Sequence, residues 1–137
     1  MAQQRTNPAA ELGIEPGHVV QELGYRDDSG QELRDGIESI IGGKLLDEEF
    51  RGVPDIILLW HQTGNGDLTT AVLFATGSLA DDGRIWLLTP KAGQAGYVDP
   101  VDIDDAARTT GLTRRDSIPV GKDWTGTPLA FPGDGEQ

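Results

Sequence analysis

Three short segments carry the residues whose types and positions could do chemistry. They are Gly24-Tyr25, Trp60-His61-Gln62 and Thr89-Pro90-Lys91, and each lies at the end of a run typical of a strand. The carboxyl ends of parallel strands meet at one edge of an open α/β sheet, and such sheets bind their ligands there. A histidine at that edge suits proton transfer, and a lysine suits anion binding or oxyanion stabilisation. His61 and Lys91 are therefore the catalytic candidates.

The ligand-binding candidates are other residues at these ends and one tryptophan from later in the chain: Gly24, Tyr25, Gln62, Thr89 and Trp124. Trp124 is the tryptophan expected to be partly exposed, because Asp123 and Gly126 flank it and the other two lie in apolar runs. A structural alternative stays open for the catalytic pair. In that alternative His61 only ends a strand, and Lys91 is a solvated loop residue.

No metal site is predicted. Four aspartates cluster at positions 99, 102, 104 and 105, but the run lacks the glycine that a calcium loop needs for its sharp turn. Acids in the first turn of a helix complement its dipole, which explains the cluster without a metal. His18 and His61 lack the short spacing of paired zinc ligands, and the chain has no cysteine. The loop Lys91–Gly96 lacks the G-x-x-x-x-G-K-S/T order of a phosphate loop.

Alternating strand and helix patterns would position these residues. Strands are predicted at 19–23, 55–60 and 85–88, where short apolar runs are bounded by turn residues. A helix is predicted after each of them, at 29–41, 67–79 and 99–110, from apolar residues at helical spacing. Ser29 has capping-box spacing with Glu32, Asp67 can cap the second helix, and Asp99-Pro100 can begin the third.

The C-terminal part departs from this alternation. Strands at 113–120 and 127–131 are predicted to pair as an antiparallel hairpin, because no helix fits the connection Gly121–Gly126. The predicted fold class is α/β: a three-layer, Rossmann-like sandwich with a mostly parallel sheet and a C-terminal antiparallel hairpin. Residues 12–131 are expected to form this single domain, between flexible tails at 1–11 and 132–137.

The segments 19–24, 55–60 and 79–86, together with the closing hairpin, are similar to those of class I methyltransferases with a Rossmann-like fold. The chain as a whole resembles a small actinobacterial family of unknown function. That resemblance rests mainly on these segments: Leu12-Gly13-Ile14, Leu58-Leu59-Trp60, the run 85–91 and Gly121-Lys122-Asp123-Trp124. It covers about residues 12–131 and implies no established activity.

The resemblance to methyltransferases implies a cofactor loop of the form E-x-G-x-G-x-G, and this chain departs from that pattern. Glu22 and Gly24 match it, but Arg26 and Asp28 occupy later glycine positions. Side chains there would crowd a nucleotide or an S-adenosyl group, and the aspartate would repel phosphates. The strand that carries an acid for ribose hydroxyls in those enzymes is missing or very short, since only Lys44-Leu45-Leu46 lies there. No cofactor is therefore expected.

Composition limits the function further. The chain has 137 residues, 11 Lys+Arg against 23 Asp+Glu, a net charge of -12 and a hydrophobic fraction of 36%. This balance argues against binding to nucleic acid or to anionic membranes, because both need an excess of basic residues. The polar N-terminus and the shortness of the apolar runs predict a cytoplasmic protein without a membrane span.

The charge is also unevenly distributed, since ten of the twelve net negative charges fall within residues 1–83. This asymmetry is compatible with a protein partner that has a basic surface, with self-association, or with an ordinary solubilising surface. The leading hypothesis is a non-catalytic binding or regulatory module that engages a protein partner. The alternatives are a small enzyme or ligand sensor that uses a pocket at the strand ends, and a structural subunit of a larger assembly.

Overall fold

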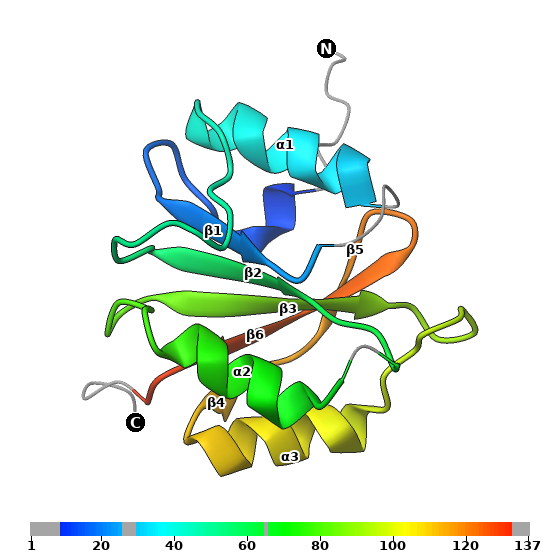
Figure 1. Ribbon diagram of the computed structural model, residues 1–137. Helices are drawn as coiled ribbons and strands as arrows, with labels where there is room; N and C mark the ends of the chain where they lie inside the picture. The colour runs from blue at the N-terminus through cyan, green and yellow to red at the C-terminus, as the bar shows by residue number, and fades with distance from the viewer. Residues whose placement is uncertain (1–8, 26–29, 65, 133–137) are drawn as a thin grey trace.

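A mixed sheet of six strands forms the centre of the molecule, in the order β1-β2-β3-β6-β4, with β5 also paired to β6 (Figure 1). The computed structural model describes residues 9–25, 30–64 and 66–132. The strands, in chain order, are β1 (Val20–Leu23), β2 (Ile56–Trp60), β3 (Arg84–Pro90), β4 (Thr113–Arg114), β5 (Ile118–Val120) and β6 (Trp124–Ala130).

The sheet has a parallel half and an antiparallel half. Strands β1, β2 and β3 are parallel neighbours, whereas β6 is antiparallel to β3, β4 and β5. The antiparallel pairing of the C-terminal strands is therefore confirmed. The expectation of a mostly parallel sheet holds only for the first half, because β6 lies inside the sheet, between β3 and the β4 and β5 edge. The predicted strand 113–120 is interrupted, and β6 begins at Trp124, three residues before the predicted start.

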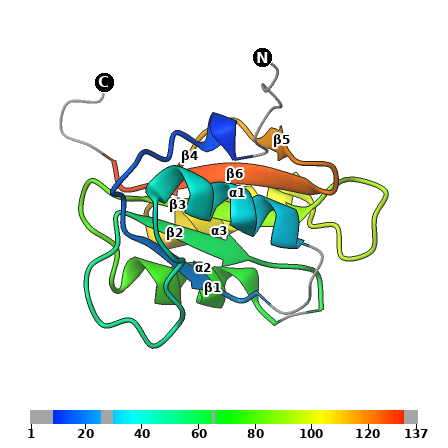
Figure 2. The same ribbon diagram turned by 90° about the horizontal axis from the view of Figure 1, so that it is seen from above.

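Helices lie on both faces of the sheet. Helix α1 (Gln31–Ile41) covers one face, and α2 (Leu68–Thr76) and α3 (Pro100–Thr110) cover the other (Figure 1). The view from above shows the strands running beneath α1 (Figure 2). Side chains alternate along β2, so that Ile57 and Leu59 join the core under α2 and α3, whereas Leu58 and Trp60 join the core under α1.

Two predicted caps fix the starts of α2 and α3. The Asp67 carboxylate accepts a hydrogen bond from the backbone N–H of Thr70 at 2.9 Å, and that of Asp99 accepts one from Val101 at 3.0 Å. Ser29 lies outside the described residues, so its predicted capping box stays a prediction. Gly30 stands at the N-cap position of α1.

The folded part begins earlier than the predicted boundary at residue 12. A 3₁₀ helix, η2, spans Ala10–Leu12, and both Ala9 and Leu12 are buried in the core under α1. The indole nitrogen of Trp86 in β3 donates a hydrogen bond to the carbonyl of Leu12 at 2.9 Å, which ties this segment to the sheet. Residues 9–11, expected to belong to a flexible tail, are therefore part of the folded chain, and Ala9 belongs to its core.

Candidate functional site

A cavity of about 360 Å³ opens at the carboxyl ends of β1 and β2, on the face covered by α2. Its position agrees with the rule that open α/β sheets bind ligands beyond the carboxyl ends of their strands. The wall is mainly apolar and includes the aromatic residue Phe74, one carboxylate and one imidazole. The lining residues are Leu23, Gly24, Glu48, Leu59, Trp60, His61, Ala71 and Phe74.

Gly24 makes the turn out of β1 into this cavity. Its φ is +81°, and a Cβ at this position would lie 2.6 Å from the carbonyl oxygen of Trp60. No real side chain fits that distance, so only glycine lets the chain leave β1 so close to the end of β2. The structure thus places this predicted binding residue in the cavity wall.

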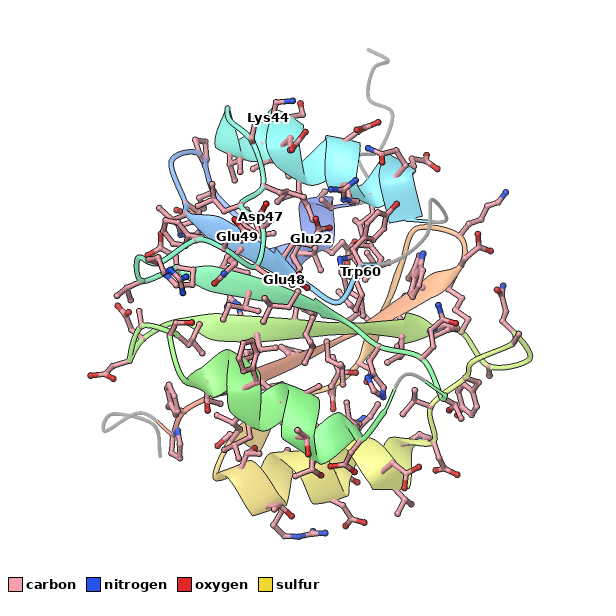
Figure 3. The ribbon with its side chains drawn as sticks, viewed as in Figure 1. Glu22, Lys44, Asp47, Glu48, Glu49 and Trp60 are labelled. Carbon is pink, nitrogen blue, oxygen red and sulfur yellow. The ribbon has the colours of Figure 1, made fainter. Side chains whose placement is uncertain are left out.

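Glu48 is the acidic residue of the cavity, and it was not among the predicted site residues. Its carboxylate Oε2 accepts a hydrogen bond from the backbone N–H of Gly24 at 3.0 Å. The segment before it adds to the sheet at β1, where Leu46 forms a parallel bridge with Gln21. This bridge brings Glu48 past the end of β1, where it lines the cavity together with Trp60 (Figure 3).

The expected very short strand is thus a single bridge, and an acid does follow it. The signal in the sequence was the run Asp47-Glu48-Glu49 directly after Lys44-Leu45-Leu46. A local pattern does not show which of these three carboxylates turns toward Gly24, because that contact joins residues 24 positions apart.

His61 follows β2 and lies in the cavity wall with only 5% of its surface exposed. Its backbone N–H donates to the carbonyl of Leu88 at 3.0 Å, which continues the pairing of β2 with β3. Burial lowers the pKa of the imidazole from 6.5, and the nearby Asp67 carboxylate opposes this only in part. The ring is therefore neutral at pH 7 and adds no positive charge to the cavity.

This lowered pKa predicts a pH-dependent stability. As the pH decreases below 6.5, the unfolded chain takes up a proton at His61 before the folded chain does. The free energy of unfolding therefore decreases as the pH is lowered. Above that range the residue contributes no pH dependence. We expect His61→Gln to reduce the loss of stability between pH 7 and pH 5, measured by urea unfolding, and His18→Gln to retain it. Equal pH profiles for His61→Gln and the unchanged protein would contradict this assignment.

Lys91, the second catalytic candidate, lies outside the described wall of the cavity that contains His61. Its Nζ donates to the carbonyl of Gly121 at 3.1 Å. Thr89 is buried opposite Thr125 in the pairing of β3 with β6. Gln62 lies outside the cavity wall and packs against Gly96. Of the predicted catalytic pair, only His61 lines this cavity.

An aromatic cluster fills the same end of the sheet on the face covered by α1. The ring of Trp60 lies between those of Tyr25 and Trp124, with centroid distances of 5.0 and 4.8 Å and edge-on contacts. Trp124 is only 6% exposed, so the expectation that this tryptophan is partly exposed was wrong. The Arg34 guanidinium lies 4.1 Å from the centroid of the Tyr25 ring.

Glu22 connects this cluster to α1. Its carboxylate accepts hydrogen bonds from Arg34 Nε at 2.7 Å, from Arg34 Nη2 at 2.9 Å and from the indole Nε1 of Trp60 at 3.0 Å. The hydrogen bond with Glu22 raises the pKa of Arg34. Glu22, which matches the acid of the methyltransferase loop, is thus engaged by side chains of the protein itself.

A second, more polar hollow of about 380 Å³ lies at the start of α2 and includes His61, Asp67, Asp102 and Asp105 in its wall. Within the described ranges, no three His, Cys, Asp or Glu side chains are placed to hold a metal ion. Among the described residues, no helix is both long enough and apolar enough to cross a membrane.

The strand order and the helices on both faces define a methyltransferase-like fold. A SAM-dependent methyltransferase from Aquifex aeolicus superposes with a TM-score of 0.68 at 12% identity, covering 90% of this chain and 88% of that one. A mitomycin 7-O-methyltransferase gives a TM-score of 0.62 at 10% identity, over 84% of this chain. This chain spans about half of that enzyme, 49% of its length. At such identities the likeness concerns the fold alone.

The chain belongs to the family described as protein of unknown function DUF3052, whose model matches residues 9–133. Uncharacterised proteins of Mycobacterium bovis and Mycobacterium tuberculosis are 42% identical to it over 131 residues. The matched region covers 96% of this chain and 82% of each relative. The resemblance to a family of unknown function is thereby confirmed.

The described residues do not fit S-adenosylmethionine in the way the fold implies. A nucleotide-type cofactor needs open space between the first strand and the start of the following helix. Here the Trp60 indole fills that space, because a Cβ on Gly30 would lie 2.4 Å from its ring. The acid of the loop is occupied by Arg34 and Trp60, and the Gly24 amide by Glu48.

Proposed function

We propose that this protein is a non-catalytic binding module that holds a small molecule in the cavity beyond β1 and β2. The observation that carries the proposal is the cavity itself, about 360 Å³ in volume and bounded by a glycine turn, apolar side chains and one carboxylate. Such a concave, mainly apolar space with few polar groups is typical of small-molecule sites. A binding role is favoured over catalysis because Lys91 is held by Gly121, outside the cavity wall.

The earlier hypothesis of a protein partner or of self-association is a separate proposal about the surface. Leu73 and Phe74 on α2 favour it, since 58% and 71% of their surfaces are exposed. Phe74 also forms part of the cavity wall, so a partner docked on α2 would cover the entrance to the small-molecule site.

A thermal-shift screen tests the small-molecule site. Adenine nucleotides, S-adenosylmethionine, nicotinamide nucleotides and a library of small aromatic fragments would be titrated against the purified chain. We expect saturable stabilisation by at least one aromatic fragment, because mainly apolar walls favour such ligands. Ala71→Phe, which fills the cavity from α2, should abolish the shift.

Leu73→Phe is the matched control, because it adds a ring to the same helix at an exposed position outside the cavity lining. This variant should retain the shift. Stabilisation that persists in Ala71→Phe, or the absence of a saturable shift for every compound, would overturn the proposed function.

A further inference from the structure

The charged residues at the cavity are acidic. Its wall contains the carboxylate of Glu48, and none of its described lining residues is a lysine or an arginine. Asp47 and Glu49 flank Glu48 and are exposed like it, whereas Lys44 lies apart from it, beside α1 in the view of Figure 3. The chain as a whole carries a net charge of -12. The entrance therefore attracts cations and repels anions.

The helix α2 adds an aromatic ring to the wall of this cavity. Phe74 of α2 lines the cavity, and Leu59 and Ala71 complete its apolar surface. An aromatic face attracts a cation through its quadrupole, and the attraction adds to that of a nearby carboxylate. An apolar body on the ligand would be buried against the aliphatic side chains.

The acidic group is also held in place. One oxygen of Glu48 accepts the Gly24 N–H at 3.0 Å, and an ionised carboxylate can accept further hydrogen bonds. The same contact works against an anionic ligand, because the backbone donor at the end of β1 is already occupied by a negative charge. A carboxylate or phosphate ligand would have to displace Glu48 from it.

We propose that the ligand of this cavity is an organic cation, an ammonium group on an aromatic or aliphatic body, and that Glu48 is the residue that selects it. The inference rests on the proposed small-molecule function and specifies the ligand class. The ammonium group would lie beside the Glu48 carboxylate, and the apolar body between Phe74 and Leu59. His61, which is neutral, would border the ligand without repelling it.

Three fragments with one ring and different charges test the selection. Benzylammonium, benzyl alcohol and benzoate would be titrated at pH 7 and low salt, and amide shifts of Gly24, His61 and Ala71 followed by NMR. We expect benzylammonium to bind about fivefold more tightly than benzyl alcohol, the range of an exposed charge pair with a cation–π contact. Benzoate should give no saturable shift.

Glu48→Gln preserves the shape of the side chain and an oxygen that can accept the Gly24 N–H. It should weaken benzylammonium about fivefold and leave benzyl alcohol unchanged. Glu49→Gln, which removes the neighbouring exposed charge, should change the affinity for benzylammonium less than twofold. Raised salt should reduce the preference for the cation.

The outcomes separate the two proposals. Equal binding of benzylammonium and benzyl alcohol, or an equal loss of both in Glu48→Gln, would overturn the cation inference and leave the small-molecule site standing. Absence of saturable shifts at Gly24, His61 and Ala71 with all three fragments would overturn the inference and count against the small-molecule site itself.

Discussion

Replacing Trp60 with alanine is expected to lower the free energy of unfolding by about 4 kcal/mol, the range for a large buried aromatic side chain. Only 4% of its surface is exposed, and its ring contacts both Tyr25 and Trp124 edge-on. Truncation would leave a cavity between β2 and α1 and remove the indole donor to Glu22. Guanidinium unfolding followed by far-UV circular dichroism measures the loss.

Trp60→Phe separates the ring from its hydrogen bond. Phenylalanine keeps an aromatic group between Tyr25 and Trp124 but has no N–H for the Glu22 carboxylate, so we expect a smaller loss of about 2 kcal/mol. Phe74→Ala is the matched control, because its ring is 71% exposed and its removal should cost less than about 1 kcal/mol. A loss below about 1 kcal/mol in Trp60→Ala would show that the cluster does not support the fold.

The local elements of the fold could be predicted because their signals are local. Asp67 and Asp99 lie at helix starts, and their carboxylates bond to backbone N–H groups two or three residues further on. The apolar runs of β2 and β3 are almost completely buried, as their lack of polar residues predicts. The place of β6 between β3 and the β4 and β5 edge was missed, because strand order depends on pairing between distant residues.

The candidate site could be predicted only in part, for the same reason. Gly24 and His61 were found because both follow strands whose carboxyl ends meet. Glu48 was missed because its role depends on the single bridge between Leu46 and Gln21. Trp124 was misjudged from its polar neighbours in the sequence, whereas its burial comes from contact with Trp60, 64 positions away.

Replacing Glu22 with glutamine is expected to cost about 3 kcal/mol, because it leaves the Arg34 guanidinium without its opposite charge in a mostly buried setting. Glu22 is 8% exposed, and the Arg34 side chain is 24% exposed. Both oxygens of the carboxylate are engaged, by two nitrogens of Arg34 and by the indole of Trp60. A glutamine offers one acceptor and turns its NH₂ group toward a cation or another donor.

A double-mutant cycle decides whether the loss comes from this ion pair. Arg34→Met removes the charge and keeps an extended side chain on α1, and the double variant Glu22→Gln/Arg34→Met leaves neither charge unpaired. Urea unfolding gives the loss in unfolding free energy for each variant. We expect the sum of the losses in the two single variants to exceed the loss in the double variant by about 2 kcal/mol. Losses that add to within about 0.5 kcal/mol would mean that each side chain acts alone. Coupling of the expected size would make the pair one of the contacts that hold α1 against β1, next to the Trp60 indole that fills the cofactor space of the fold.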